Sequence, residues 1–226
     1  MNIKPIGVIH TPFPEKFGIP RQSGLADTES KIVFLNEYRN PDAVRGLEGY
    51  SHIWLIWQFS QSLREGWSPT VRPPRLGGNK RVGVFATRSP FRPNELGLSS
   101  VELVRIDYQD KNAPVLYVKG ADILDGTPIF DIKPYLSFTD SHPDAICGFA
   151  DENFKYHLDV YIPPEICFKF PSEKLLAFKE ILSNDPRPAY QSDENRVYKM
   201  TCFGYDTEFT VNGSTLTVIN INKSEE

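Results

Sequence analysis

The sequence predicts a mainly β protein, in which a mainly antiparallel sheet closes, or nearly closes, into a barrel and a small α+β domain follows. Short segments in the first two thirds alternate apolar and polar residues, and Gly, Pro and Asn separate them. This region also lacks the long helices that parallel strand–helix–strand crossovers need. The strongest amphipathic helix pattern begins only near residue 172.

The barrel is expected within residues 1–150. The expected strands are, in chain order, 6–10, 31–35, 52–59, 81–86, 99–106, 115–119 and 127–135. Between them only residues 41–47 have a helical pattern, and this segment is short. Closure into a barrel leaves such a sheet without exposed edges, so it is the favoured arrangement.

Residues 151–226 are expected to form the α+β domain. Ser172 is expected to cap a helix whose apolar side carries Leu175, Leu176, Phe178, Ile181 and Leu182. Asn184-Asp185-Pro186 ends this helix. Strands are expected at 196–203, 207–211 and 215–220, and Asn212-Gly213 predicts a hairpin between the last two. A unit of roughly 70 residues has little core of its own and is expected to lean on the barrel.

The composition is typical of a soluble globular chain, with 40% hydrophobic and 24% charged residues among 226. No apolar run approaches a membrane span, and no signal peptide is expected at the N-terminus. Cys147, Cys167 and Cys202 are scattered and show no C-x-x-C spacing. We expect reduced, mostly buried thiols of a cytoplasmic protein, with no disulfide and no metal site.

The net charge of −4 is unevenly distributed. Residues 64–105 contain three acidic and eight basic residues, namely Arg64, Arg72, Arg75, Lys80, Arg81, Arg88, Arg92 and Arg105. This tract therefore carries +5 and the rest of the chain −9. Such a tract suits a phosphate-bearing partner. Simple solvation of loop charges explains the composition equally well.

A stiff loop is expected at residues 83–94. Pro90 and Pro93 restrict φ there, so Arg88 and Arg92, four residues apart, would face a fixed point. Their planar guanidinium groups suit a carboxylate or a phosphate. A rigid turn with exposed arginines is the alternative.

Two other segments can approach a ligand. Asp125-Gly126-Thr127-Pro128 predicts a tight turn, and Asp122, Asp125 and Asp131 could place carboxylates near one mouth of the barrel. From these four turn residues alone, an ordinary hairpin turn is the favoured interpretation. Pro20-Arg21-Gln22 lies in a loop of residues 11–30, and loops longer than about 12–15 residues tend to be functional or disordered.

Several nucleotide-binding and hydrolytic signatures are absent from the sequence. It contains no G-x-G-x-x-G after a strand, no phosphate-binding P-loop, no H-E-x-x-H and no G-x-S-x-G. A Rossmann-type methyltransferase or dehydrogenase is therefore disfavoured.

The same segments resemble the TrmO family. The similar blocks occur in the family's order: residues 6–13, 20–22, 46–52, 72–78, 83–94 and 125–135, with 185–190 similar to a motif of its bacterial C-terminal extension. The resemblance implies a single-sheeted β-barrel that binds S-adenosylmethionine, generally as a homodimer. It also implies N6-methylation of threonylcarbamoyl-adenosine at position 37, next to the anticodon of tRNA for threonine.

The resemblance also implies a set of cofactor contacts: Arg21, Gln22, Ser60, Gln61, Arg88, Leu98, Asp125, Gly126, Thr127 and Pro128. An arginine can pair with the methionine carboxylate, and an aspartate can accept from the ribose or the amine. The family permits Arg at the position of His10, so no catalytic role is expected for His10. Arg187 and Tyr190 are expected to extend the surface that contacts the anticodon loop.

Methyl transfer is an in-line displacement to which positioning contributes much of the acceleration. Asp125 or Asp131 is expected to accept the proton of the attacking nitrogen. Two other functions remain open: a barrel that senses S-adenosylmethionine or a nucleotide without transferring a group, and a phosphate-ester hydrolase.

Overall fold

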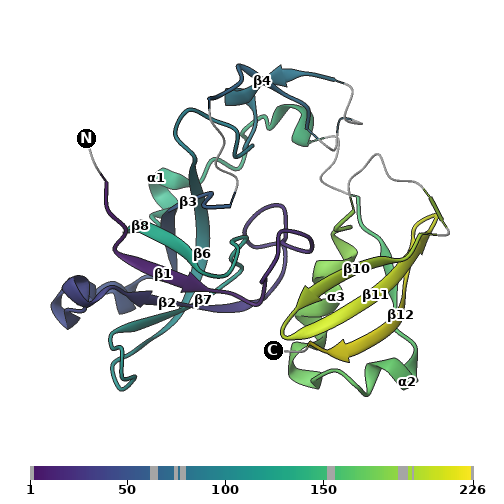
Figure 1. Ribbon diagram of the computed structural model, residues 1–226. Helices are drawn as coiled ribbons and strands as arrows, with labels where there is room; N and C mark the ends of the chain where they lie inside the picture. The colour runs from purple at the N-terminus through teal and green to yellow at the C-terminus, as the bar shows by residue number, and fades with distance from the viewer. Residues whose placement is uncertain are drawn as a thin grey trace.

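The structure is a computed structural model that describes residues 3–61, 66–73, 76, 80–151, 156–187, 193–194 and 196–224. Six strands form a closed barrel in the order β1-β2-β7-β6-β3-β8, and every neighbouring pair is antiparallel (Figure 1). These strands are β1 (Gly7–His10), β2 (Glu29–Phe34), β3 (His52–Gln58), β6 (Leu96–Asp107), β7 (Val115–Lys119) and β8 (Thr127–Pro134). The predicted mainly β fold with a closed antiparallel barrel is confirmed.

Every second side chain of the barrel strands points inward and fills the inside of the barrel. In β3, Ile53, Leu55 and Trp57 are buried, whereas the residues between them face outward and are half-buried. Buried residues of the other strands, such as Ile9 and Leu116, complete the same core. Successive strand residues point to opposite faces, so the sequence alternation translates directly into this inside and outside. The barrel interior is a packed core, as expected for so small a barrel.

Two predicted elements differ from the structure. Of residues 81–86 only β5 (Val82–Gly83) is a strand, and it pairs with β4 (Thr70–Val71) outside the barrel before the 3-10 turn η5 (Val84–Ala86). The predicted helix at 41–47 is two 3-10 turns, η2 (Pro41–Val44) and η3 (Leu47–Gly49). Gly46 separates these turns with a φ of +86°, a conformation that no α-helix contains.

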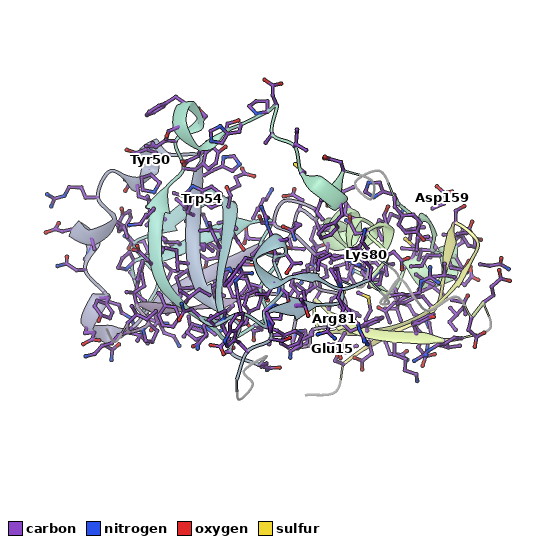
Figure 2. The ribbon with its side chains drawn as sticks, turned by 90° about the horizontal axis from the view of Figure 1, so that it is seen from above. Glu15, Tyr50, Trp54, Lys80, Arg81 and Asp159 are labelled. Carbon is purple, nitrogen blue, oxygen red and sulfur yellow. The ribbon has the colours of Figure 1, made fainter. Side chains whose placement is uncertain are left out.

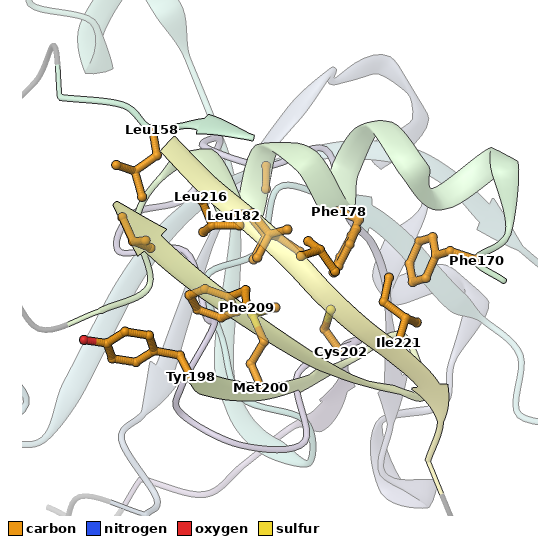
Figure 3. Packing of buried hydrophobic residues seen from close by; sticks show 14 of the residues in the cluster. Leu158, Phe170, Phe178, Leu182, Tyr198, Met200, Cys202, Phe209, Leu216 and Ile221 are labelled. Carbon is orange, nitrogen blue, oxygen red and sulfur yellow. The ribbon is translucent and has the colours of Figure 1, made fainter. Parts of the chain in front are cut away.

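The C-terminal unit is a four-stranded sheet with the helix α3 (Leu175–Ser183) packed on it (Figure 3). Its order is β10 (Tyr198–Cys202), β11 (Tyr205–Asn212), β12 (Thr215–Lys223) and β9 (Asp159–Tyr161). The predicted helix, strands and hairpin are confirmed, except that Leu176, expected on the apolar side of the helix, is 66% exposed. The short β9, which runs parallel to β12, was not predicted. Shorter helical segments are α1 (Ser137–Asp140), η1 (Asn36–Tyr38), η6 (Gly148–Ala150), α2 (Pro164–Cys167) and η7 (Ser172–Lys174).

Ser172 does not cap the long helix. It is the first residue of the 3-10 turn η7, and Pro171 occupies the N-cap position of that turn. The N-cap residue of α3 is Lys174, which makes no side-chain capping bond. The predicted cap is therefore wrong, because one extra turn precedes the α-helix.

The loop of residues 11–28, between β1 and β2, joins the two units. Phe13 is fully buried and Ala26 is 3% exposed, and both belong to the core of the C-terminal unit rather than to the barrel core. Phe17 stacks on Phe209 of β11 with ring centroids 6.4 Å apart. Figure 1 shows this loop reaching from the barrel toward the C-terminal sheet. The predicted domain boundary near residue 151 stays a prediction, but the C-terminal core includes residues from the barrel side of it.

The three cysteines are free thiols in different environments. Cys202 is buried, and burial raises the pKa of its thiol to about 12. Cys167 is half-buried and Cys147 is exposed, so the expected burial is wrong for Cys147. Among the described residues there is no cluster of His, Cys, Asp and Glu able to hold a metal ion. Within the same part of the chain, no helix has both the length and the apolar character needed to cross a bilayer.

Candidate binding site

A cavity of about 450 Å³ opens at the barrel rim where β3 ends and β6 and β8 begin. Four segments that are distant in sequence line it: residues from 16–22, 54–61, 87–98 and 122–127. Antiparallel pairing of β3 with both β6 and β8 places these strand ends at one rim. The loop of residues 11–28 closes one side of this cavity because the C-terminal unit holds it in place.

Seven of the ten residues that the sequence suggested as cofactor contacts line this cavity: Arg21, Gln22, Ser60, Gln61, Arg88, Leu98 and Thr127. Thr127 is buried and donates through Oγ1 to the carbonyl of Leu124 at 2.7 Å, which ties the turn to the cavity wall. Asp125, Gly126 and Pro128 belong to the same turn but do not line the cavity. Barrel closure thus brings most of the predicted set together.

The two aspartates suggested as proton acceptors have partners outside the cavity. The Asp125 carboxylate lies 3.3 Å from Nδ1 of His10 and accepts the backbone N–H of Thr11 at 3.0 Å. The Asp131 carboxylate pairs with Nζ of Lys133 at 2.9 Å. Neither residue lines the cavity.

Among the described residues, Asp122 is the carboxylate that lines the cavity. Its Oδ1 accepts the hydroxyl of Ser99 at 2.5 Å, and Ser99 accepts Nε1–H of Trp57 at 3.0 Å. Burial raises the pKa of the Asp122 carboxyl; hydrogen bonds from Ser99 and from the Ser23 amide and the positive charge of Arg88 oppose this in part. Asp122 was predicted near one mouth of the barrel but not among the cofactor contacts.

The predicted convergence of Arg88 and Arg92 is only partly right. Both line the cavity, but Arg92 turns back on its own loop and donates to the carbonyls of Thr87 at 3.0 Å and Ser89 at 3.2 Å. Arg88 instead donates to the side-chain carbonyl of Gln22 on the opposite loop. Arg92 therefore stiffens the wall, whereas Arg88 bridges two walls.

Arg21 connects the cavity to the C-terminal unit. Its guanidinium donates to the backbone carbonyls of Asp185 at 3.0 Å and Arg187 at 2.6 Å. Arg187 is 7% exposed and pairs with Asp185 at 2.8 Å, so the expectation that it contacts RNA at the surface is wrong. Tyr190, the other residue of that expectation, lies outside the described residues. The motif at 185–187 thus supports the cavity wall from behind.

The remaining lining is largely apolar and aromatic. Trp57 and Phe59 meet edge to face with ring centroids 4.4 Å apart, and Trp54, Leu96 and Leu124 extend this surface. An aromatic and aliphatic wall with a few charged groups is typical of small-molecule sites. These residues fit a ligand that has a flat heterocycle at one end and charged groups at the other.

The basic tract separates into distinct parts. Arg72, Lys80 and Arg81 are exposed at or beside the β4–β5 pair, and Figure 2 shows Lys80 and Arg81 on the side facing the C-terminal unit. Arg105 lies near the far end of β6, where it pairs with Glu29 at 3.1 Å and covers the ring of Tyr117. Arg64 and Arg75 lie outside the described residues. Arg105 therefore does not contribute an uncompensated charge to the cavity rim.

Two family models match the chain. The model described as "tRNA-methyltransferase O N-terminal domain" matches residues 8–141, which span the barrel and most of the cavity lining. The model described as "TrmO C-terminal domain" matches residues 171–224, which include α3 and the hairpin.

Individual proteins show the same similarity over most of the chain. The tRNA (adenine(37)-N6)-methyltransferase of Escherichia coli is 45% identical over 196 residues, covering 84% of this chain and 83% of that protein. The Pseudomonas aeruginosa protein named "Putative S-adenosylmethionine-dependent methyltransferase RcsF" is 39% identical over 211 residues, 85% of this chain and 84% of its own. A crystal structure of Pseudomonas aeruginosa TrmO superimposes with a TM-score of 0.80 at 30% identity, covering 99% and 97% of the two chains.

Proposed function

Because this chain belongs to the TrmO family of tRNA methyltransferases, we propose that it transfers a methyl group from S-adenosylmethionine to N6 of adenine 37 in tRNA. The observation that carries the proposal is that one cavity brings together seven predicted cofactor residues, the half-buried carboxylate of Asp122 and an aromatic wall. We expect the protein in the cytoplasm, where its proposed tRNA substrate is found.

The residues of the cavity suit the parts of this cofactor. When bound, S-adenosylmethionine supplies a methyl group on a positively charged sulfur. The aromatic wall around Trp57 and Phe59 offers a surface for the adenine, and Arg88 offers a fork of donors for the methionine carboxylate. Holding both reactants in line can supply a large part of the rate enhancement, so a rigid cavity wall contributes to catalysis by positioning them. Arg92 and Arg21 provide that stiffness through their bonds to backbone carbonyls.

We propose threonylcarbamoyl-adenosine in tRNA for threonine as the specific substrate. The carbamoyl group makes the N6–H more acidic than that of adenine, so its proton is lost more easily during attack. The test uses labelled S-adenosylmethionine and two tRNA pools, one carrying the threonylcarbamoyl modification and one from cells that lack it. Label in the modified pool alone is expected. Label in both pools would show that the threonylcarbamoyl group is not required and would contradict this substrate. No label in either pool, despite cofactor binding, would favour the sensor function.

The hydrolase alternative makes a different prediction with the same protein. Release of phosphate from simple phosphate esters, without any methyl transfer, would support it. The described residues offer no metal cluster to such an enzyme, and the cavity carboxylate Asp122 is bonded to a serine rather than to a histidine base.

The role of Asp125 or Asp131 as proton acceptor stays a prediction. Each is to be replaced by asparagine, and single-turnover methyl transfer measured with the cofactor saturating. A drop of about 10²-fold or more in one variant is expected if its carboxylate takes the proton. Normal rates in both would contradict the role and favour proton transfer by the substrate or by water. The contacts of Asp125 with His10 and of Asp131 with Lys133 lie outside the cavity and favour the second outcome.

We also propose that the exposed cations Arg72, Lys80 and Arg81 contact tRNA phosphates. Replacing all three by glutamine is expected to weaken tRNA binding and to make the slope of log affinity against log salt shallower by about 2–3. Each phosphate contact that is lost means that about one counterion fewer is released on binding. The matched control is Arg105→Gln, since Arg105 is already paired with Glu29. An unchanged slope in the triple variant would contradict this surface.

A homodimer is proposed as the working assembly. Leu98 is 57% exposed and lines both the cavity and an adjacent groove with Trp54 and Ile56, so a second copy would cover apolar surface beside the site. Light scattering should then give about twice the 25.7 kDa mass of one chain.

A further inference from the structure

Two opposite charges of the cavity, Arg88 and Asp122, have no ionic partner among the residues that the structure describes. No described carboxylate lies within ion-pair distance of Arg88, which donates instead to the neutral side-chain amide oxygen of Gln22. No described cation lies within that distance of Asp122, which is bonded to Ser99. Arg88 nevertheless acts electrostatically on the Asp122 carboxyl, so the two groups face one cavity without closing on each other.

A structural role alone does not explain a carboxylate at position 122. The bonds from Ser99 and from the Ser23 amide need only an acceptor, which an asparagine provides without a buried charge. Burial is the largest influence on the Asp122 carboxyl and raises its pKa, which means that ionisation costs stability in the folded protein. Buried groups that are maintained against such a cost, inside a cavity, are candidates for ligand binding.

The amino-acid end of the cofactor matches this pair of charges. An α-amino acid carries its ammonium and its carboxylate on the same carbon, so its receptor needs a cation and an anion that are close but not in contact. The Arg88 fork suits the carboxylate, and a fixed carboxylate oxygen suits the ammonium. The chain Trp57–Ser99–Asp122 fixes that oxygen, with bonds of 3.0 and 2.5 Å.

We propose that Asp122 and Arg88 form a clamp for the zwitterionic methionine end of S-adenosylmethionine, Asp122 binding the ammonium and Arg88 the carboxylate. This assignment rests on the proposed cofactor. It leaves the aromatic wall for the nucleoside and makes Asp122 a binding residue that the suggested cofactor set lacks.

Calorimetric titration with two product-like ligands tests the clamp. S-adenosylhomocysteine contains the amino-acid end, whereas 5′-methylthioadenosine has the same nucleoside and thioether without it. Asp122→Asn is expected to bind S-adenosylhomocysteine at least about tenfold more weakly than the wild type, since a charge-assisted bond is lost. Its affinity for methylthioadenosine is expected to stay within about twofold, because the clamp does not touch the nucleoside. Arg88→Gln should show the same selective loss.

Controls separate the clamp from other roles of Asp122. Asp144→Asn removes one exposed carboxylate far along the chain and should leave both affinities unchanged. Because the pKa of Asp122 is raised, its stability cost is absent below the ordinary carboxyl pKa, grows as pH rises from there to the raised value, and is fully present above it. Asp122→Asn should therefore melt no lower than the wild type at pH 7, which shows that it is folded.

Three results would overturn the clamp. They are an unchanged affinity of Asp122→Asn for S-adenosylhomocysteine, an equal loss for both ligands, and a fall in kcat at saturating cofactor with KM unchanged. The last would make Asp122 a proton acceptor instead. The proposed function fails separately, if the wild type neither binds S-adenosylhomocysteine nor transfers a methyl group.

Discussion

Replacing Gly97 by alanine is expected to destabilise the barrel by about 1–3 kcal/mol and to remove most cofactor binding. A Cβ at this position would lie 2.3 Å from Cε2 of Trp57 and 2.5 Å from its Cζ2. Trp57 is 6% exposed and packs against Phe59, so its rigid ring has little room to retreat. Moving the ring also breaks its bond to Ser99, which fixes Asp122. Urea unfolding and S-adenosylhomocysteine titration measure the two effects.

Gly83→Ala is the matched control for Gly97→Ala. A Cβ at Gly83 would meet nothing within 4 Å, and its φ of −57° is ordinary for alanine. This variant should unfold and bind like the wild type. The double variant Gly97→Ala, Trp57→Leu should recover part of the stability but not the binding, because leucine makes room without restoring the indole N–H. Normal binding in Gly97→Ala would contradict the role given to Trp57.

Arg187→Ala is expected to cost about 3–5 kcal/mol of stability, the range typical for breaking a buried ion pair from one side. The side chains of Arg187 and Asp185 are each 9% exposed and are joined by bonds of 2.8 and 3.0 Å. Removing the arginine leaves the Asp185 carboxylate buried without its cation; among the described residues, the hydroxyl of Tyr156 and the backbone N–H of residue 187 remain as its donors. Urea unfolding, followed by circular dichroism, measures the loss.

The same change is expected to weaken cofactor binding at a distance. Arg21 donates to the carbonyls of Asp185 and Arg187, so a shift of this segment releases a residue of the cavity wall. A rise in KM for S-adenosylmethionine under conditions where the variant is still folded would be the signature of this effect. A variant that binds normally would show that the segment stabilises only the C-terminal unit.

Arg196→Ala is the control for the loss of a cation from this region. Arg196 is exposed and lies over the ring of Tyr198 at 5.3 Å, whereas Arg187 lies over it at 5.7 Å from within the protein. Its removal should cost no more than about 1 kcal/mol. Asp185→Asn combined with Arg187→Ala should recover part of the Arg187→Ala loss, because it also removes the unpaired charge. Asparagine is also among the few residues that tolerate the φ of +50° at position 185. If the double variant is no more stable than Arg187→Ala, the buried charge is not the cause.

Local patterns were sufficient for most of the fold. The strand predicted at 115–119 has these bounds in the structure, and the hairpin at Asn212-Gly213 joins β11 and β12. These features depend on alternation over a few residues and on the φ that a turn residue permits, and both are encoded within a short window. Residues 81–86 had a similar pattern and were predicted wrongly, because pairing with β4 ends after two residues.

The sequence by itself determined the barrel, the C-terminal unit and, through its motifs, the family, and it grouped seven residues that share one cavity. Only the tertiary structure decided which aspartate faces that cavity. Asp122 and Asp125 are three residues apart, yet one is bonded to Ser99 inside the site and the other to Thr11 outside it. Burial, pairing and electrostatic environment are set by residues distant along the chain, so no local pattern contains them. The burial of Arg187 and of Phe13 could not be predicted from the sequence for the same reason, since each is enclosed by residues from the other unit or from a remote strand.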